Sequence, residues 1–168
     1  ESDTLNPGFY FVDSIGFKSI SFDKSLCKEP VEAGSGKISV LLVEPNKYPK
    51  MIEIDDTLEA MQEVVGGDIE EYMPFEDEVA IICNEEGKIT GMAPNRAVYE
   101  ENSREMLDII CGKFFVAYAP FEAERFQSLP PDLAEKYREK FKYPERFMRV
   151  NNEIVAVPFK PVRADKER

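Results

Sequence analysis

Histidine and tryptophan are both absent from this 168-residue chain. Without histidine the chain cannot build a Ser-His-Asp or Cys-His catalytic arrangement, a histidine-ligated zinc site or a histidine-based pH switch. Long apolar runs are missing as well, since segments such as Ile38 to Val43 have only the length of a strand. A membrane-spanning helix needs about 20 apolar residues, and no signal-peptide pattern is present either. We therefore expect a cytoplasmic protein that does not enter a membrane.

Cysteine is scarce, with only Cys27, Cys83 and Cys111, an odd number without the spacing of a metal site. Cys83 and Cys111 each follow an apolar run, so we interpret both as small core residues in a reducing compartment. A reactive thiol is the alternative, and it would need an exposed, electropositive setting. We expect no metal and no cofactor.

Basic residues are also outnumbered, since 21 Lys and Arg face 33 Asp and Glu and give a net charge of −12. Such a chain does not bind a phosphate backbone by bulk electrostatics, so no direct nucleic-acid binding is expected. It is suited to a protein partner with a basic surface, and mimicry of DNA charge is the extreme form of that idea. The acids occur in short clusters between basic residues, which is typical of a solvated surface. The oligomeric state stays open.

What the chain does contain is enough apolar sequence for a core, 43% of its residues. We predict three parts: an N-terminal hairpin and linker over residues 1–36, a core domain over 37–120, and a C-terminal helix and tail over 121–168. The hairpin is predicted from Gly8–Val12 and Phe17–Phe22, and the linker from 23 to 36.

The core is predicted as strand, turn, strand, helix, strand, strand. Period-two alternation and β-branched runs place the strands at Ile38–Val43, Met51–Ile54, Ile69–Met73, Val79–Cys83, Lys88–Met92, Phe114–Ala119 and Glu153–Phe159. Ile38–Val43 is apolar except for Ser39, so it is expected to be buried on both faces, and Phe114–Ala119 is expected in the centre of the sheet. Residues 93–102 read as a looser stretch.

Three helices are predicted. The first begins at Asp56 as N-cap with Glu59 as its capping-box partner, and it ends at Gly66-Gly67. Its apolar stripe consists of Leu58, Met61, Val64 and Val65. A short helix over Ser103–Ile110 and a C-terminal helix over 131–142 follow. Together these elements predict an α+β fold, a mixed sheet with a short helix packed on one face, β-grasp-like in one version, plus the C-terminal helix.

Several short motifs resemble one known family. They are Val43–Pro45, Ile54–Leu58, Val65–Gly67, Asn84–Lys88, Pro94–Ala97 and Asp108–Gly112. This set is similar to domain of unknown function 3846, found in proteins of bacteriophages and conjugative transposons. A further stretch, Phe11–Phe17, resembles the closing strands of a YodL-like domain. The resemblance implies a piece of a polyvalent mobile-element protein of the kind linked to protection of incoming DNA from host restriction. It carries no active site.

Pro94-Asn95-Arg96 is the strongest candidate for a binding site, because an arginine fork beside an amide can hold a carboxylate or a phosphate. Asn84, in the turn before Gly87, and Tyr99 complete the candidate set. Pairing of Arg96 with a local acid is the structural alternative. No catalytic constellation is present, so we expect a non-enzymatic acidic protein-interaction module, whose partner is a host protein or another protein of the same element. The alternative is a small-ligand-binding domain or enzyme with its site at Asn95 and Arg96.

Overall fold

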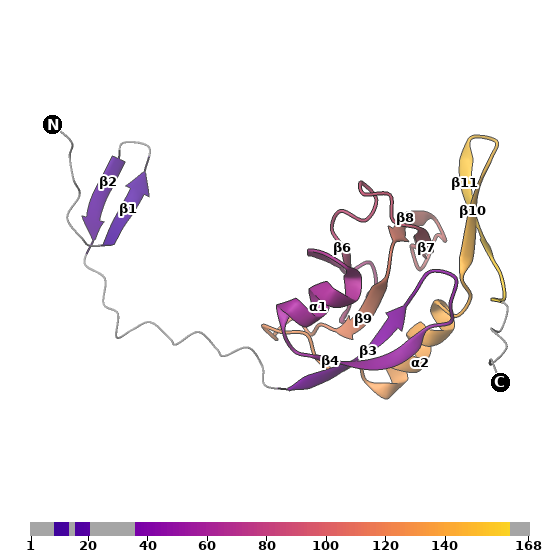
Figure 1. The fold of residues 1–168 in the computed structure, drawn as a ribbon, viewed down its shortest axis with the longest axis horizontal. Helices are drawn as coiled ribbons and strands as arrows, with labels where there is room; N and C mark the ends of the chain where they lie inside the picture. Colours follow the sequence, from indigo (N-terminus) through magenta and orange to yellow (C-terminus); the bar gives the residue numbers. More distant parts are fainter. Residues whose placement is uncertain (1–8, 14–15, 21–35, 162–168) are drawn as a thin grey trace. The chain divides into compact units, whose positions relative to one another are not determined.

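The computed structural model describes residues 9–13, 16–20 and 36–161 of the chain. The chain divides into two compact units, Glu1–Glu32 and Ala33–Arg168. In the first unit, β1 (Phe9–Asp13) and β2 (Gly16–Ile20) pair as an antiparallel hairpin, at the place where the sequence predicts one (Figure 1). Cys27 and nearly all of the linker expected over 23–36 lie outside the described residues.

The second unit is built mainly of strands. Its strands are β3 (Lys37–Val43), β4 (Lys50–Asp55), β5 (Ile69–Tyr72), β6 (Val79–Asn84), β7 (Pro94–Tyr99), β8 (Met106–Cys111), β9 (Phe114–Tyr118), β10 (Glu145–Val150) and β11 (Glu153–Pro158), and its helices are α1 (Leu58–Val65) and α2 (Pro131–Lys140). In the part of the chain that the structure describes, neither helix has the length and apolar character needed to cross a membrane.

Five strands form the central sheet in the order β4-β3-β9-β6-β5. The α+β class is confirmed, and β9 lies in the centre as predicted, between β3 and β6. Every ladder of this sheet is antiparallel, whereas the sequence led us to expect a mixed sheet. The reason is the β7–β8 hairpin, which brings the chain back to the C-terminal end of β6. β9 begins there and therefore runs antiparallel to β6. The β-grasp comparison therefore remains unsupported.

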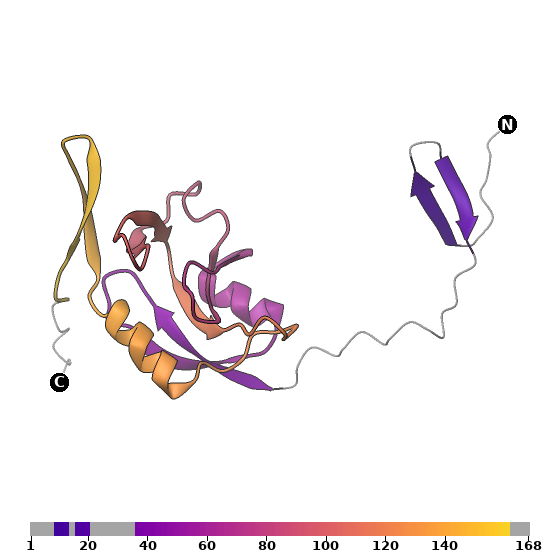
Figure 2. The same cartoon turned by 180° about the vertical axis from the view of Figure 1, so that it is seen from behind.

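The two helices cover opposite faces of the sheet (Figures 1 and 2). Alternate residues of β9 show the division, since Phe115 and Ala117 pack in the cluster that contains α1. Phe114 and Val116 pack in the other cluster, which contains α2 and also the inward side chains of β7 and β8. The short helix α1 thus covers one face of the sheet, and α2 covers the other.

Helix α1 is capped by Thr57 and not by Asp56. The Thr57 hydroxyl accepts a hydrogen bond from the Ala60 amide at 3.2 Å. Met61 and Val65 are buried as the apolar stripe predicts, but Leu58 is 52% exposed. Leu58 directly follows the Thr57 cap, in the first turn of the helix. The sheet therefore supports only the later part of the stripe.

The predicted helix over Ser103–Ile110 is wrong. Residues 106–111 form β8, which pairs with β7 along its length. The turn between them is closed by the Glu100 amide, which donates to the Glu105 carbonyl, and Arg104 adopts a left-handed φ of 59°. Pairing between two strands outweighs the weak helical period of a short segment that contains two adjacent β-branched residues.

The strand predicted at Lys88–Met92 is also wrong. These residues form consecutive turns, in which Thr90 donates through its amide and its hydroxyl to the Glu86 carbonyl. The Met92 amide bonds to the Gly87 carbonyl, and no strand partner remains for this segment among the described residues. The looser stretch expected at 93–102 is instead where β7 runs.

Helix α2 ends two residues before the limit of 142 that the sequence predicts. Tyr137 and Phe141 are buried, and Leu133, four residues before Tyr137, is half-buried against the same cluster. Of the last hairpin the sequence predicts only the second strand, at Glu153–Phe159. Its partner, β10, is missed because it mixes charged and apolar residues without burying a face.

Asp77, in the loop between β5 and β6, joins that loop to α2. Its carboxylate accepts hydrogen bonds from the Lys136 ammonium and from the Tyr137 hydroxyl, the latter at 2.8 Å. These two bonds, that of Lys136 first, hold the pKa of Asp77 below its ordinary value of 3.8.

Stability is therefore expected to depend on the ionisation of Asp77. A pKa that is lower in the folded chain means that this stabilisation is present above the unfolded pKa, about 3.8, and is lost as the pH falls through the folded pKa. Asp77→Asn should cost about 1 kcal/mol near neutral pH and flatten the acid limb. Urea unfolding at a series of pH values from about 7 to about 2.5 measures the loss near neutral pH and the pH dependence of stability in acid. Glu63→Gln, at an exposed position of α1, is the matched control, and an acid limb that Asp77→Asn leaves unchanged contradicts this role.

Candidate functional site

Asn95 and Arg96, the centre of the site that the sequence indicates, lie in β7 and are each only 1% exposed. The Asn95 side-chain amide donates to the carbonyl oxygens of Val43 at 2.9 Å and Gly112 at 2.7 Å. These bonds connect β7 to the end of β3 and to the turn between β8 and β9. The Asn95 amide is thus occupied by the backbone of the protein itself.

The Arg96 guanidinium makes four hydrogen bonds, all within the protein. Its Nε donates to the Phe141 carbonyl at 3.0 Å, and Nη2 donates to the Lys47 carbonyl at 2.8 Å. Its Nη1 donates to both oxygens of Asn95. Arg96 therefore joins β7 to the end of α2 and to the β3–β4 turn. Arg96 thus has a structural role, which the sequence offered as the alternative to ligand binding. Its acceptors, however, are carbonyl oxygens and not the local acid that the sequence led us to expect.

Glu145, at the start of β10, is the acid whose negative charge raises the pKa of Arg96. Burial raises the pKa of Glu145, while the amide of Ala97, which donates to its carboxylate at 2.6 Å, and the charge of Arg96 lower it. Burial lowers the pKa of Arg96 to about 10, and the charge of Glu145 opposes that change. The guanidinium therefore stays charged at neutral pH, with its donors bonded to carbonyl oxygens.

The other two candidate residues do not join this cluster. Asn84 ends β6, and its side-chain oxygen accepts from the Glu86 amide at 2.9 Å. Tyr99 ends β7 opposite Met106, and burial and then the charge of Glu145 raise the pKa of its hydroxyl. Asn84 thus stabilises the turn that its sequence context predicts, and the four residues do not converge on one cavity.

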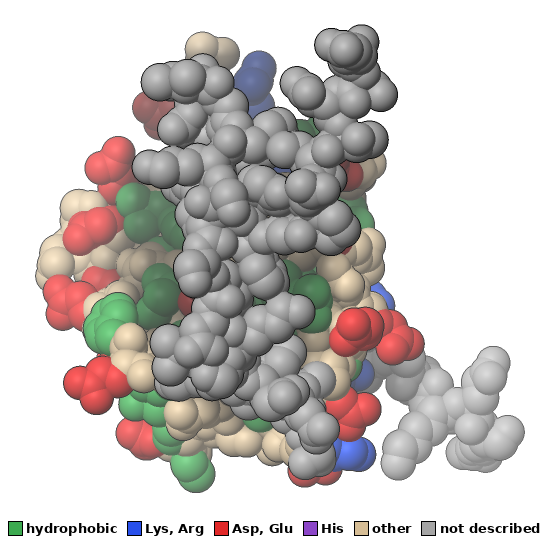
Figure 3. Space-filling view, turned by 90° about the vertical axis from the view of Figure 1, so that its left-hand side faces the viewer, with side chains coloured by type: hydrophobic (Ala, Val, Ile, Leu, Met, Phe, Trp, Pro, Cys, Tyr) green, Lys and Arg blue, Asp and Glu red, His purple; other side chains and the backbone are tan. Residues whose placement is uncertain are grey.

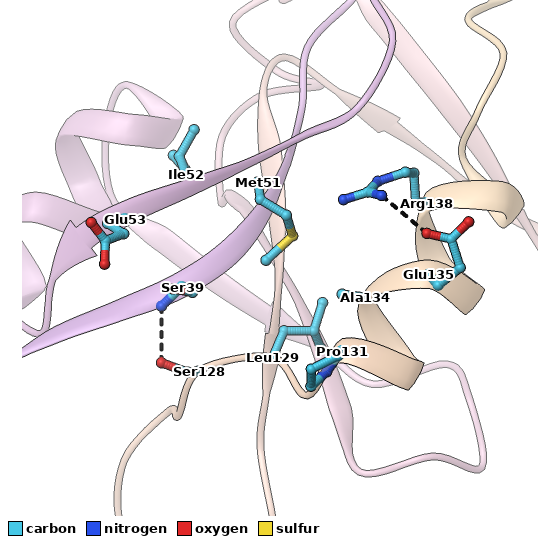
Figure 4. Close-up of a pocket in the computed structure, with 10 residues that line it drawn as sticks. All are labelled: Ser39, Met51, Ile52, Glu53, Ser128, Leu129, Pro131, Ala134, Glu135 and Arg138. Carbon is cyan, nitrogen blue, oxygen red and sulfur yellow. Dashed lines mark hydrogen bonds and ion pairs between the residues drawn. The ribbon is translucent and has the colours of Figure 1, made fainter.

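A groove with a volume of about 760 Å³ lies between β4 and α2. Figure 4 shows the Met51 side chain reaching from β4 toward α2, while Ile52 points to the other side of the strand. Leu129, Pro131 and Ala134 form the facing apolar wall. The groove is therefore open beside an edge strand and apolar at its base.

Two polar features border the groove. At one end the Ser39 amide donates to the Ser128 hydroxyl at 3.0 Å, which anchors the segment leading into α2 (Figure 4). At the other end Arg138 pairs with Glu135 at 3.0 Å. Glu53 lies on the β4 side, and no ion pair engages it within residues 36–161. Sequence reasoning missed this groove, because its walls come from segments about 80 residues apart.

A smaller hollow of about 360 Å³ lies over β8, where the Lys88 ammonium pairs with the Asp108 carboxylate. Cys111 borders it, and burial raises the pKa of this thiol and raises that of Cys83 to about 11. Both thiols are therefore protonated at neutral pH, which argues against a reactive role. Cys83 is buried as the sequence predicts, whereas Cys111 is only half-buried. Within the described ranges, no three acids or cysteines are placed to hold a metal ion.

Comparison with known proteins identifies one family. The family described as "Domain of unknown function (DUF3846)" matches residues 38–142, which include β3 to α2 and both walls of the groove. No curated protein and no solved structure matches the chain. The match leaves out the β1–β2 and β10–β11 hairpins.

Proposed function

Because the chain belongs to the DUF3846 family, a family of unknown function, we propose that it is a non-enzymatic interaction module that binds an extended protein segment along β4. The groove beside the free edge of β4 is the observation that carries this proposal. A strand at the edge of a sheet presents unpaired backbone N–H and C=O groups, to which an extended peptide adds as a further strand.

The shape of the groove suits such a peptide. Successive side chains of an added strand point to opposite faces, so every second one enters the groove between β4 and α2. There Met51, Leu129 and Ala134 offer an apolar surface. Backbone pairing then supplies affinity, and the apolar wall selects the side chains that enter.

The charge of the module favours a basic partner. The net charge is −12, and acidic side chains outnumber basic ones on the visible part of the face in Figure 3. Glu53 stands beside the groove without an ion-pair partner in residues 36–161, so a lysine or arginine of the segment can pair with it. We infer an extended segment that alternates apolar with polar residues and carries basic groups.

The resemblance to mobile-element proteins supports a host protein, or another protein of the same element, as the source of that segment. In that setting the wider role is interference with host restriction. The competing function, a small-ligand or catalytic site at Asn95 and Arg96, has weaker support, because all four bonds of Arg96 already go to the protein itself.

Selection of peptides of about ten residues from a random display library, followed by fluorescence polarisation, tests the proposal. Selected peptides should alternate apolar residues and carry Lys or Arg. Glu53→Arg should weaken their binding about tenfold, which is 1.4 kcal/mol. Methylation of alternate peptide amides should abolish binding, because it removes the backbone donors.

Glu63→Arg is the matched control, since it makes the same charge change at an exposed position of α1, on the other face of the sheet. Equal binding by the Glu53→Arg and wild-type chains, or full tolerance of amide methylation, would overturn the strand-addition proposal.

A further inference from the structure

The β10–β11 hairpin extends from the body of the second unit in both views (Figures 1 and 2). Its base is anchored by the bond from the Ala97 amide to Glu145 and by the Phe159 amide, which donates to the Pro144 carbonyl at 2.8 Å. Among the described residues, β10 and β11 form a two-stranded sheet of their own. A two-stranded ribbon without a partner surface is marginally stable in water.

The register divides the hairpin into two faces. One face contains Phe147 opposite Ala156, both half-buried, so this face lies toward the body. The other, which we call the outer face, carries four apolar side chains that are 38–51% exposed: Met148, Val150, Val155 and Val157. Met148 and Val155 are direct cross-strand neighbours at its centre. An apolar stripe on an exposed ribbon is typical of an interaction surface.

The two ends of the outer face carry opposite charges. Arg146 lies near the base, opposite Val157, with its guanidinium over the Phe159 ring at 4.8 Å from the centroid. Glu153 lies at the tip, opposite Val150. Neither residue takes part in an ion pair within the described part of the chain.

This order makes the outer face complementary to itself. A two-fold axis that lies between the two faces, next to the Met148–Val155 pair and perpendicular to the strands, reverses base and tip. The Arg146 end of one copy then meets the Glu153 end of the other, and the apolar stripes meet between them. The same operation places the two acidic bodies at opposite ends of the contact, which keeps their like charges apart.

We propose that the outer face of the β10–β11 hairpin is a homodimer contact, in which the hairpins of two copies pack face to face in opposite directions. The proposal is independent of the β4 groove, which lies on another part of the unit. The contact is small, so a dimer dissociation constant in the micromolar range is expected.

Sedimentation equilibrium of the full chain from about 1 to about 200 µM tests the proposal. The wild-type chain should dimerise, and Met148→Glu should be monomeric throughout, because it places a charge in the apolar stripe. Ile154→Glu is the matched control, since Ile154 is 50% exposed on the opposite face, and this variant should dimerise like the wild type. Far-ultraviolet circular dichroism verifies that both variants are folded.

A charge exchange distinguishes this contact from a general apolar association. Arg146→Glu alone and Glu153→Arg alone should each weaken dimerisation about tenfold, whereas the double variant should recover most of the loss. A monomeric wild-type chain, an Ile154→Glu variant as weak as Met148→Glu, or a double variant weaker than both single ones would each overturn the proposal.

Discussion

Replacing Arg96 with methionine should lower the free energy of unfolding by about 3–5 kcal/mol. Methionine fills much of the volume but donates no hydrogen bond, so the buried carbonyl of Phe141 and the carbonyl of Lys47 lose their donors. The Asn95 oxygens lose theirs as well. Urea unfolding followed by circular dichroism measures the change.

Arg138→Met is the matched control, because this arginine is 42% exposed and pairs only with a neighbour on the same helix. Its expected cost is within about 0.5 kcal/mol. Arg96→Lys should lower the free energy of unfolding almost as much as Arg96→Met, since a single ammonium cannot reach carbonyls in three directions. If Arg96→Met retained wild-type stability, the bracing role would be wrong and the ligand-binding alternative would regain its basis.

Truncation of Phe114 to alanine is expected to cost about 3–5 kcal/mol. Phe114 is fully buried in the central strand, and its ring meets that of Phe141 edge to face with centroids 5.3 Å apart. The cavity would lie between the sheet and the end of α2, so it would remove the surface on which that helix rests. Urea unfolding and thermal unfolding both measure this loss.

Phe121→Ala is the control of identical chemistry, since Phe121 is 77% exposed and should cost less than about 0.5 kcal/mol. If Phe114→Ala and Phe121→Ala lowered the free energy of unfolding equally, the position of Phe114 in the core would be contradicted. A peptide that binds along β4 should also lose affinity when Phe114 is truncated, because α2 forms the opposite wall of the groove.

Arg96 and Asn95 show that the sequence can single out important residues and still leave their role undecided. A charged side chain among apolar neighbours signals that its donors must find acceptors. It does not say whether those acceptors belong to a ligand or to the backbone. Here they belong to residues 45 positions later and 49 positions earlier. Local sequence carries no information about contacts at such separations.

The segment over 88–111 shows the limit for local structure. Its short periods fit helix, strand and loop almost equally well, and the pairing of β7 with β8 selects one of them. The strongly patterned segments behave differently. β3 and β9 are mostly apolar and are buried on both faces over most of their length, as expected.

By itself, the sequence determined the α+β class, the central position of β9, the buried residues Met61 and Val65 of α1, and the acidic character of the chain. These properties depend on composition and on periods of a few residues. The tertiary structure alone decided that β4 is an edge strand beside α2, that Arg96 bonds to the backbone, and that one face of the last hairpin is left open. Each of these depends on which distant segments become neighbours, and such neighbours are chosen by the packing of the whole chain.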